Sequence, residues 1–533
     1  MIWKNFPFTE KYCDHLKLEY LKRIRVVVSL IFLIATALLF LDITHIIPTS
    51  YFDYITYLQF IPSFTRFLSF AKPIAFGFII ILILTVLFGR VYCSTICPLG
   101  TLQDIIIYLS KKFKKRKKFL PSKEYFWTRY SILGIIIITF LAGNTFLINL
   151  LDPFSNTGRI LSQIVNPILS LVNNFFAFTL EKLNVYLIYP IEIKIFYLSL
   201  IVFPILFSVL VLFMTYKRGR LYCNTICPVG TLLGLFSKLT IFKLKIDKKS
   251  CEGCGICSNV CKAECIDKSG KVIDFSRCIA CYNCLVVCPS DSIDYKFSNY
   301  TEVPVKIEKS RRNFISRTSL FIITLTTSAL SQIKVIPKKE STKPVNKSSY
   351  SSPPGSLSVE HFKSNCTACH LCITACPTKV LQPSLLEWGV FGILQPFMDY
   401  NTSFCNYECK VCSEVCPTGA ITKISTFQKE FIQTGRAFFV KENCIVETEN
   451  TACGACSEHC PTKAVMMVDY KNGLKIPEVK NEYCVGCGAC EFACPVKPYK
   501  AIYVDGNLYH QKAEKRPTEK IEQKVDYKEE FPF

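Results

Sequence analysis

The stretches "GRVYCSTICPLGTL" (residues 89–102) and "GRLYCNTICPVGTL" (residues 219–232) are identical at eleven of fourteen positions. Each contains the motif C-x3-C-P, and each follows a long apolar segment. A duplication of this kind predicts two structurally equivalent halves. If each motif is helical, its two cysteines lie one turn apart on the same helix face.

The segments around the duplicated motif are apolar and long enough, or nearly so, to cross a bilayer. We predict four spans, at about residues 26–47, 73–89, 131–151 and 196–216. The loop 90–129 carries ten Lys and Arg residues, so the positive-inside rule places it and the N-terminus in the cytoplasm. Two hairpins of the same orientation follow, with Cys93, Cys97, Cys223 and Cys227 at the cytoplasmic face. We expect residues 160–190, which Asn and Pro interrupt, to lie along the outer interface.

Half of the 533 residues are hydrophobic, yet the net charge is +22. This combination favours membrane spans with basic flanks over a nucleic-acid-binding protein. The basic run "KKFKKRKK" (111–118) lies between two predicted spans, which already explains it. We therefore predict a multi-pass protein of a bacterial inner membrane and no nucleic-acid partner.

The spacing of the 30 cysteines matches iron–sulfur ligation rather than a disulfide framework. "CEGCGICSNVC" (251–261) and "CIACYNCLVVCP" (278–289) both read C-x2-C-x2-C-x3-C. In two-cluster ferredoxins the fourth cysteine of each group ligates the other cluster. One predicted [4Fe-4S] site is therefore Cys251, Cys254, Cys257 and Cys288, and the second is Cys278, Cys281, Cys284 and Cys261. Lys262 replaces the usual Pro, and Cys265 offers a rival thiol.

Four further groups follow, and they predict four more [4Fe-4S] clusters, or six in all. Their cysteines are Cys366, Cys369, Cys372 and Cys376; Cys405, Cys409, Cys412 and Cys416; Cys444, Cys453, Cys456 and Cys460; and Cys484, Cys487, Cys490 and Cys494. The spacing leaves their pairing open. Zinc is the alternative for paired C-x2-C groups. Haem attachment at "CTACH" (366–370) is disfavoured, because it would leave the other two cysteines of that group, Cys372 and Cys376, without a cluster to ligate.

"SRRNFI" (310–315), followed by a mild apolar run, resembles a twin-arginine export signal. The predicted fold class is an α-helical membrane domain with α+β ferredoxin-like modules. The predicted regions are a four-helix membrane domain (1–240), a cytoplasmic two-cluster ferredoxin (241–300), a twin-arginine signal or anchor helix (301–335), a linker (336–360), a periplasmic four-cluster ferredoxin (361–507) and a charged, mobile tail (508–533).

With these motifs in this order, the first part resembles the NapH-type membrane ferredoxins, which are related to NosR and MauN. The second part, with "CPTKVLQP" and "VCPTGAI", resembles NapG or MauM. The resemblance implies a quinol dehydrogenase component that draws on the membrane quinol pool. It would pass electrons to a periplasmic reductase, such as nitrate reductase, or to a small electron carrier. Two alternatives stay open: an electron donor for maturation or reactivation of a periplasmic metalloenzyme, and a passive structural subunit.

A quinol site needs a proton acceptor near an apolar cleft. Asp42, His45, Asp152 and Arg159 lie at the outer ends of the first and third predicted spans, and we predict that they form this site. Ordinary interfacial polar groups would give the same pattern. The four thiols of the duplicated motif suit a further cluster or a redox dithiol, and structural packing is their alternative role.

Overall fold

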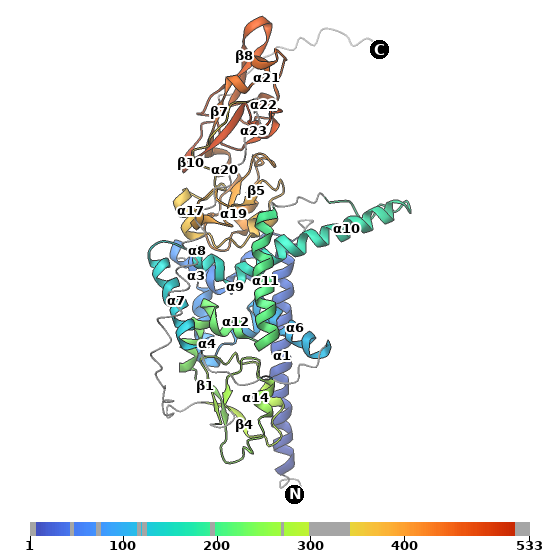
Figure 1. Cartoon of the computed structure of the whole chain (residues 1–533), viewed down its shortest axis with the longest axis vertical. Coiled ribbons are helices and arrows are strands. Elements are labelled where there is room, and N and C mark those ends of the chain that lie inside the picture. The colour runs from blue at the N-terminus through green and yellow to red at the C-terminus, as the bar shows by residue number, and fades with distance from the viewer. Residues whose placement is uncertain are drawn as a thin grey trace, which may run out of the picture.

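The computed structural model describes residues 7–42, 47–70, 76–113, 119, 125–191, 198–267, 271–297 and 342–516. Within these ranges a central helical domain carries one cysteine-rich module at each end of the long axis of the molecule (Figure 1). The predicted combination of an apolar helical region with ferredoxin-like modules is confirmed at this level. His45 and the predicted twin-arginine segment lie outside the described residues.

Two long helices, α1 (Pro7–Leu41) and α11 (Leu198–Arg218), run along the helical domain (Figure 1). Three apolar stretches among the described residues have the length and composition of a membrane span: Glu19–Leu41, Pro153–Glu181 and Leu200–Arg218. The first and last overlap the predicted spans 26–47 and 196–216. Exposed apolar side chains such as Leu206, at 64% exposure, agree with a helix that faces lipid.

The other two predicted spans are shorter helices in the structure. Residues 73–89 contain α4 (Gly77–Phe88), and residues 131–151 contain part of α7 (Phe126–Leu141) followed by the separate helix α8 (Phe146–Leu151). The segment 160–190, predicted to lie along the interface, includes α10 (Asn166–Glu181), which projects sideways from the bundle in Figure 1. Four full-length spans are therefore not seen in the described part of the chain.

Both copies of the duplicated motif form the same bent unit. In the first copy α4 leads through α5 (Tyr92–Thr95) into α6 (Pro98–Phe113), and in the second α11 leads through α12 (Leu221–Thr225) into α13 (Pro228–Phe236). Each motif is thus broken and is not one helix, because the proline starts a new helix and disfavours helical backbone just before it. The two cysteines of a motif lie on either side of this bend.

The first module pairs β1 (Phe242–Ile246) with β4 (Ile293–Phe297) in antiparallel register. Its two cysteine groups run into the short helices α14 (Ile256–Val260) and α15 (Asn283–Val286). Ile241 N donates to Val86 O at 2.9 Å, so the module continues directly from the helical domain.

The second module spans residues 342–516 of the described chain and is built on β7 (Ile432–Phe439) and β10 (Ile502–Lys512). Residues 342–360, predicted to belong to a linker, pack against it instead. Ser352 is fully buried, and Gly506 N donates to Ser349 O at 2.9 Å. β10 also extends past residue 507, where we expected the tail to begin. The serine-rich composition predicted a solvated linker, but four of these serines, Ser351, Ser352, Ser356 and Ser358, are buried against the module.

Candidate iron–sulfur sites

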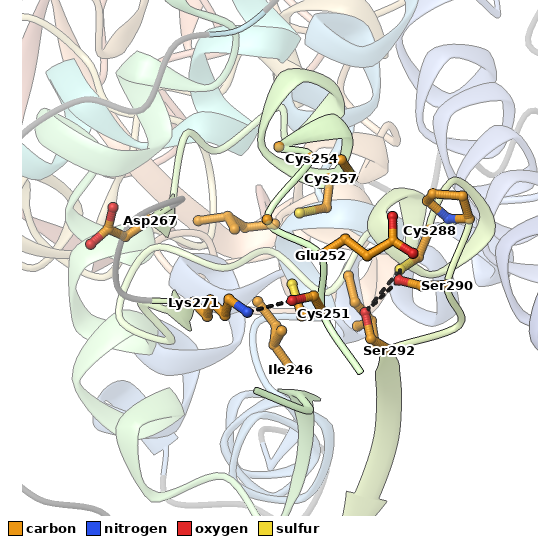
Figure 2. Close-up of a pocket in the computed structure, with 15 residues that line it drawn as sticks. Ile246, Cys251, Glu252, Cys254, Cys257, Asp267, Lys271, Cys288, Ser290 and Ser292 are labelled. Carbon is orange, nitrogen blue, oxygen red and sulfur yellow. Dashed lines mark hydrogen bonds between the residues drawn. The ribbon is translucent and has the colours of Figure 1, made fainter. Parts of the chain in front are cut away.

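The first predicted cluster site forms a small pocket (Figure 2). Its cysteines are the four that the spacing groups together: Cys251, Cys254, Cys257 and Cys288. The remaining walls include Ile246, Ile266 and Ile293. Burial by itself would raise the pKa of Cys288. Hydrogen bonds from Ser292 and Ser290 nevertheless hold this pKa below its ordinary value. A lowered pKa favours the thiolate, which is the form that binds iron.

The second predicted site gathers Cys261, Cys278, Cys281 and Cys284. Burial raises the pKa of Cys284, and the neighbouring thiols of Cys281, Cys278 and Cys261 raise it further. Cys265 lies with them, because its sulfur is 3.5 Å from that of Cys261. Five buried or half-buried thiols therefore surround this site, and Cys265 keeps its place as a rival ligand.

In the second module the structure indicates the pairing that spacing left open. Burial raises the pKa of Cys372, and the neighbouring thiols that raise it further include that of Cys416 from the next group. Burial also raises the pKa of Cys412, and the thiol of Cys376, from the preceding group, raises it further. The first pair of groups therefore exchanges its last cysteines. The resulting sets are Cys366, Cys369, Cys372 and Cys416, and Cys405, Cys409, Cys412 and Cys376.

The third and fourth groups exchange their last cysteines too. Cys444, Cys453, Cys456 and Cys494 line one pocket. The thiols of Cys484, Cys487 and Cys460 raise the pKa of Cys490, after burial, so these four form the other set. In each group a short helix contains the third cysteine, and the fourth cysteine follows within two residues of the end of that helix. The helices concerned are α18 (Leu371–Thr374), α19 (Val411–Val415), α22 (Ala455–Glu458) and α23 (Ala489–Ala493).

These sites fit iron–sulfur cubanes. Among the described residues no three His, Cys, Asp or Glu side chains converge on a point that would hold a single metal ion. A [4Fe-4S] cluster offers a separate iron to each of four cysteines, so its ligands need not converge in that way. Four thiols with apolar walls, as in the cavity of Cys444, are the donor set that such a cluster takes.

The duplicated motif brings its four cysteines together inside the helical domain, where each is at most 5% exposed. Two arginines cross between the copies. Arg90 donates to Cys223 O at 3.1 Å, and Arg220 donates to Cys93 O at 3.0 Å. Each guanidinium also lies 3.8–3.9 Å from the sulfur of the cysteine three residues after it. We call these four thiols and two arginines the central site. Its two positive charges suit an anionic group held by thiolates.

The central site contacts the first module directly. Arg90 donates to Ser276 O at 3.1 Å, and Asn224 donates to Ala263 O at 3.1 Å. The ammonium of Lys262, the residue that replaces the usual Pro, lies 3.1 Å from a carboxylate oxygen of Asp104 on α6. Ser276 lies two residues before Cys278, and Ala263 two residues after Cys261. Both copies of the motif therefore hold the loops of the second cluster site.

The opposite end of the helical domain contacts the second module. α9 (Pro153–Ile160) is buried up to Arg159, and Arg159 Nε donates to Ala368 O at 3.0 Å. Gln163 and His370 are joined by a hydrogen bond of 3.2 Å. Phe40 and Phe154 of the helical domain share a buried apolar core with the second module. Between this contact and the central site, Tyr222 donates its hydroxyl to Leu151 O at 2.9 Å.

The structure places three of the four predicted quinol-site residues. Asp152 is 1% exposed, and its carboxylate caps α9 by accepting from Ser155 N and Oγ at 2.8 and 2.6 Å. Arg159 is also buried, seven residues further along the same segment. Asp42 is half-buried and accepts from Ile47 N at 2.8 Å. His45 lies outside the described residues. We missed Arg90 and Arg220, although the motif repeats them at matching positions.

The apolar helices and the cysteine sites support iron–sulfur electron transfer by a membrane-associated, ferredoxin-like protein. Models of 4Fe-4S binding domains match residues 70–116 and 200–249, which contain the duplicated motif, and residues 271–294. A 4Fe-4S dicluster domain model matches residues 451–497, in agreement with the paired third and fourth groups. No solved structure matches the chain.

Three relatives show the range of similarity. The ferredoxin-type protein NapH of Escherichia coli is 29% identical over 224 residues, which cover 40% of this chain and 65% of NapH. An uncharacterized protein of Methanocaldococcus jannaschii is 25% identical over 42% of this chain and 70% of its own length. The methylamine utilization ferredoxin-type protein MauN of Methylobacillus flagellatus is 26% identical over 36% of this chain and 55% of its own length. The predicted resemblance to NapH and MauN is thus confirmed, whereas a fusion with a NapG-like part stays a prediction.

Proposed function

We propose that the chain oxidises a membrane quinol and carries electrons through its helical domain, between its two ferredoxin modules, to a periplasmic reductase such as nitrate reductase. One observation supports this most strongly. The central site is held against the first module by Arg90 and Asn224, and the same helical domain is held against the second module by Arg159. The printed names of the relatives support ferredoxin-type electron transfer, and the quinol and the reductase are our extension.

The proposed cofactors are six [4Fe-4S] clusters in the two modules and a seventh redox group at the central site. When bound, such clusters take up and release one electron each. The protein holds these clusters at fixed positions relative to one another. Burial of the four central-site cysteines and of part of the module cysteines limits access of water, and the module contacts fix the positions of neighbouring sites.

We also propose that the first module is cytoplasmic and the second periplasmic. The two modules lie at opposite ends of the helical domain (Figure 1). The basic loop 90–129 begins at Arg90, which contacts the first module, and the positive-inside rule predicts that this loop is cytoplasmic. Replacing Arg311 and Arg312 with Lys should block export, so that external protease no longer digests residues 361–507 in spheroplasts. Lys338→Arg, a conservative change downstream of the pair, should leave the module accessible. A wild-type module that is already protected would show that this arrangement is wrong.

The proposed quinol site is formed by Asp42, His45, Asp152 and Arg159, and the three of these that the structure describes lie at the second-module end of the helical domain. Among these, Asp152 is the best-placed proton acceptor that the structure describes, because its carboxylate is buried beside apolar helices. Asp152→Asn should slow the reduction of the clusters by quinol about a hundredfold, the usual scale for losing a general base.

The measurement is the bleaching of cluster absorbance after menaquinol or ubiquinol is added to oxidised, reconstituted protein. Asp53→Asn is the matched control, because Asp53 lies at the same end and forms ion pairs with Arg66 and Lys423. Equal rates in both variants would place the site elsewhere. Absence of reduction by any quinol would favour the alternative, a donor for maturation or reactivation of a periplasmic metalloenzyme.

A further inference from the structure

Arg159 is a buried cation at the contact between the helical domain and the second module. Its side chain is 1% exposed, and its Nε donates to Ala368 O at 3.0 Å. A second nitrogen donates to Asn149 O, and the guanidinium carbon lies 5.5 Å from the centre of the Phe203 ring. The third nitrogen, Nη1, is buried and has no hydrogen-bond partner within the described ranges. A cation buried this deeply is costly unless it faces negative charge.

Two sources of negative charge lie near it: the carboxylate of Asp152 in the helical domain, and the cysteines of a cluster site in the second module. Ala368 lies inside the C-x2-C loop of Cys366 and Cys369. Burial raises the pKa of Cys369 to about 12, and Arg159 opposes that rise. The helix and the loop touch closely here, since a Cβ on Gly158 would lie 2.5 Å from Cys369 O. The guanidinium therefore sits next to the cluster site of Cys366, Cys369, Cys372 and Cys416.

We propose that Arg159 sets the reduction potential of the [4Fe-4S] cluster at this site and so makes it the entry point for electrons into the second module. Uptake of an electron adds one negative charge to the site. A fixed positive charge in a water-excluded environment stabilises the reduced form more than the oxidised form. Arg159 is a positioning residue of the helical domain that acts on a cofactor held by the other unit. The entry role rests on the proposed electron transfer, whereas the effect on potential does not.

Redox titration with chemical mediators, followed by electron paramagnetic resonance, tests this without quinol. Arg159→Gln should lower the midpoint potential of one cluster by about 59 mV or more, which is tenfold in a one-electron equilibrium. Arg159→Lys keeps the charge and should retain most of the potential. Asp152→Asn removes a negative charge that acts on Cys369 and should shift the same cluster upward. The signal is assigned by its loss in Cys416→Ala.

Arg129→Gln is the matched control. Arg129 is fully buried as well, but it binds Ser276 of the first module, so its loss should leave this potential unchanged. Opposite shifts in Arg159→Gln and Asp152→Asn cannot arise from loosened packing alone. If Arg159→Gln keeps its full iron content and the potential is unchanged, Arg159 only holds the loop in place and the proposal is wrong. If that variant loses iron, Asp152→Asn decides, and an unchanged potential there contradicts the proposal.

Discussion

Cys93→Ser and Cys223→Ser should each reduce electron passage between the two modules to background, while the module clusters remain in place. The four motif cysteines are buried at the central site, which two arginines cross-link. A hydroxyl can replace a packed thiol of similar size, but it cannot replace a thiolate that ligates iron or exchanges a disulfide. Loss of transfer with retention of module clusters is therefore specific to a redox role.

Stopped-flow measurement of first-module reduction by quinol, with iron analysis of the same samples, checks this, because electrons from the proposed quinol site must pass the central site to reach that module. Cys13→Ser is the control, because Cys13 belongs to none of the ligand groups. Full transfer rates in both motif variants would make the thiols structural. The reciprocal hydrogen bonds of Arg90 and Arg220 to the backbone of the other copy would then be the reason for the duplication.

Purified protein should contain about 24 iron and 24 sulfide ions in its modules, because 24 cysteines form six groups of four. Iron at the central site would add to this number. Cys366→Ala and Cys416→Ala should each remove about four iron ions and the same spectroscopic signal, although these residues belong to different groups. Zinc with little sulfide would contradict the cluster assignment.

The exchange of last cysteines between groups is tested by comparing the two clusters in a Cys376 variant. Cys376→Ala should spare the cluster of Cys366 and deplete that of Cys405, even though Cys376 is the sequence neighbour of the Cys366 group. The opposite result would mean that each group ligates its own cluster. Cys13→Ser should keep the full iron content.

Local patterns determined much of this protein. Cysteine spacing predicted six ligand groups in the modules, because cluster ligation requires thiols at short, regular intervals. The duplicated motif revealed the repeat, and long apolar segments indicated a membrane domain. Similarity to NapH and MauN ferredoxin-type proteins agrees with that assignment.

Tertiary structure decided the rest, because it depends on which distant segments meet. Spacing cannot say that Cys416 joins Cys366, since that pairing arises from two loops folding face to face. Hydropathy overstated the spans 73–89 and 131–151, because it registers apolar composition and not where a helix stops. The serine-rich composition of 342–360 predicted a linker, because composition does not register that the fold of the second module buries four of these serines. Arg159 resembled an interfacial charge, and only the docking of the second module places it beside the loop of Cys369.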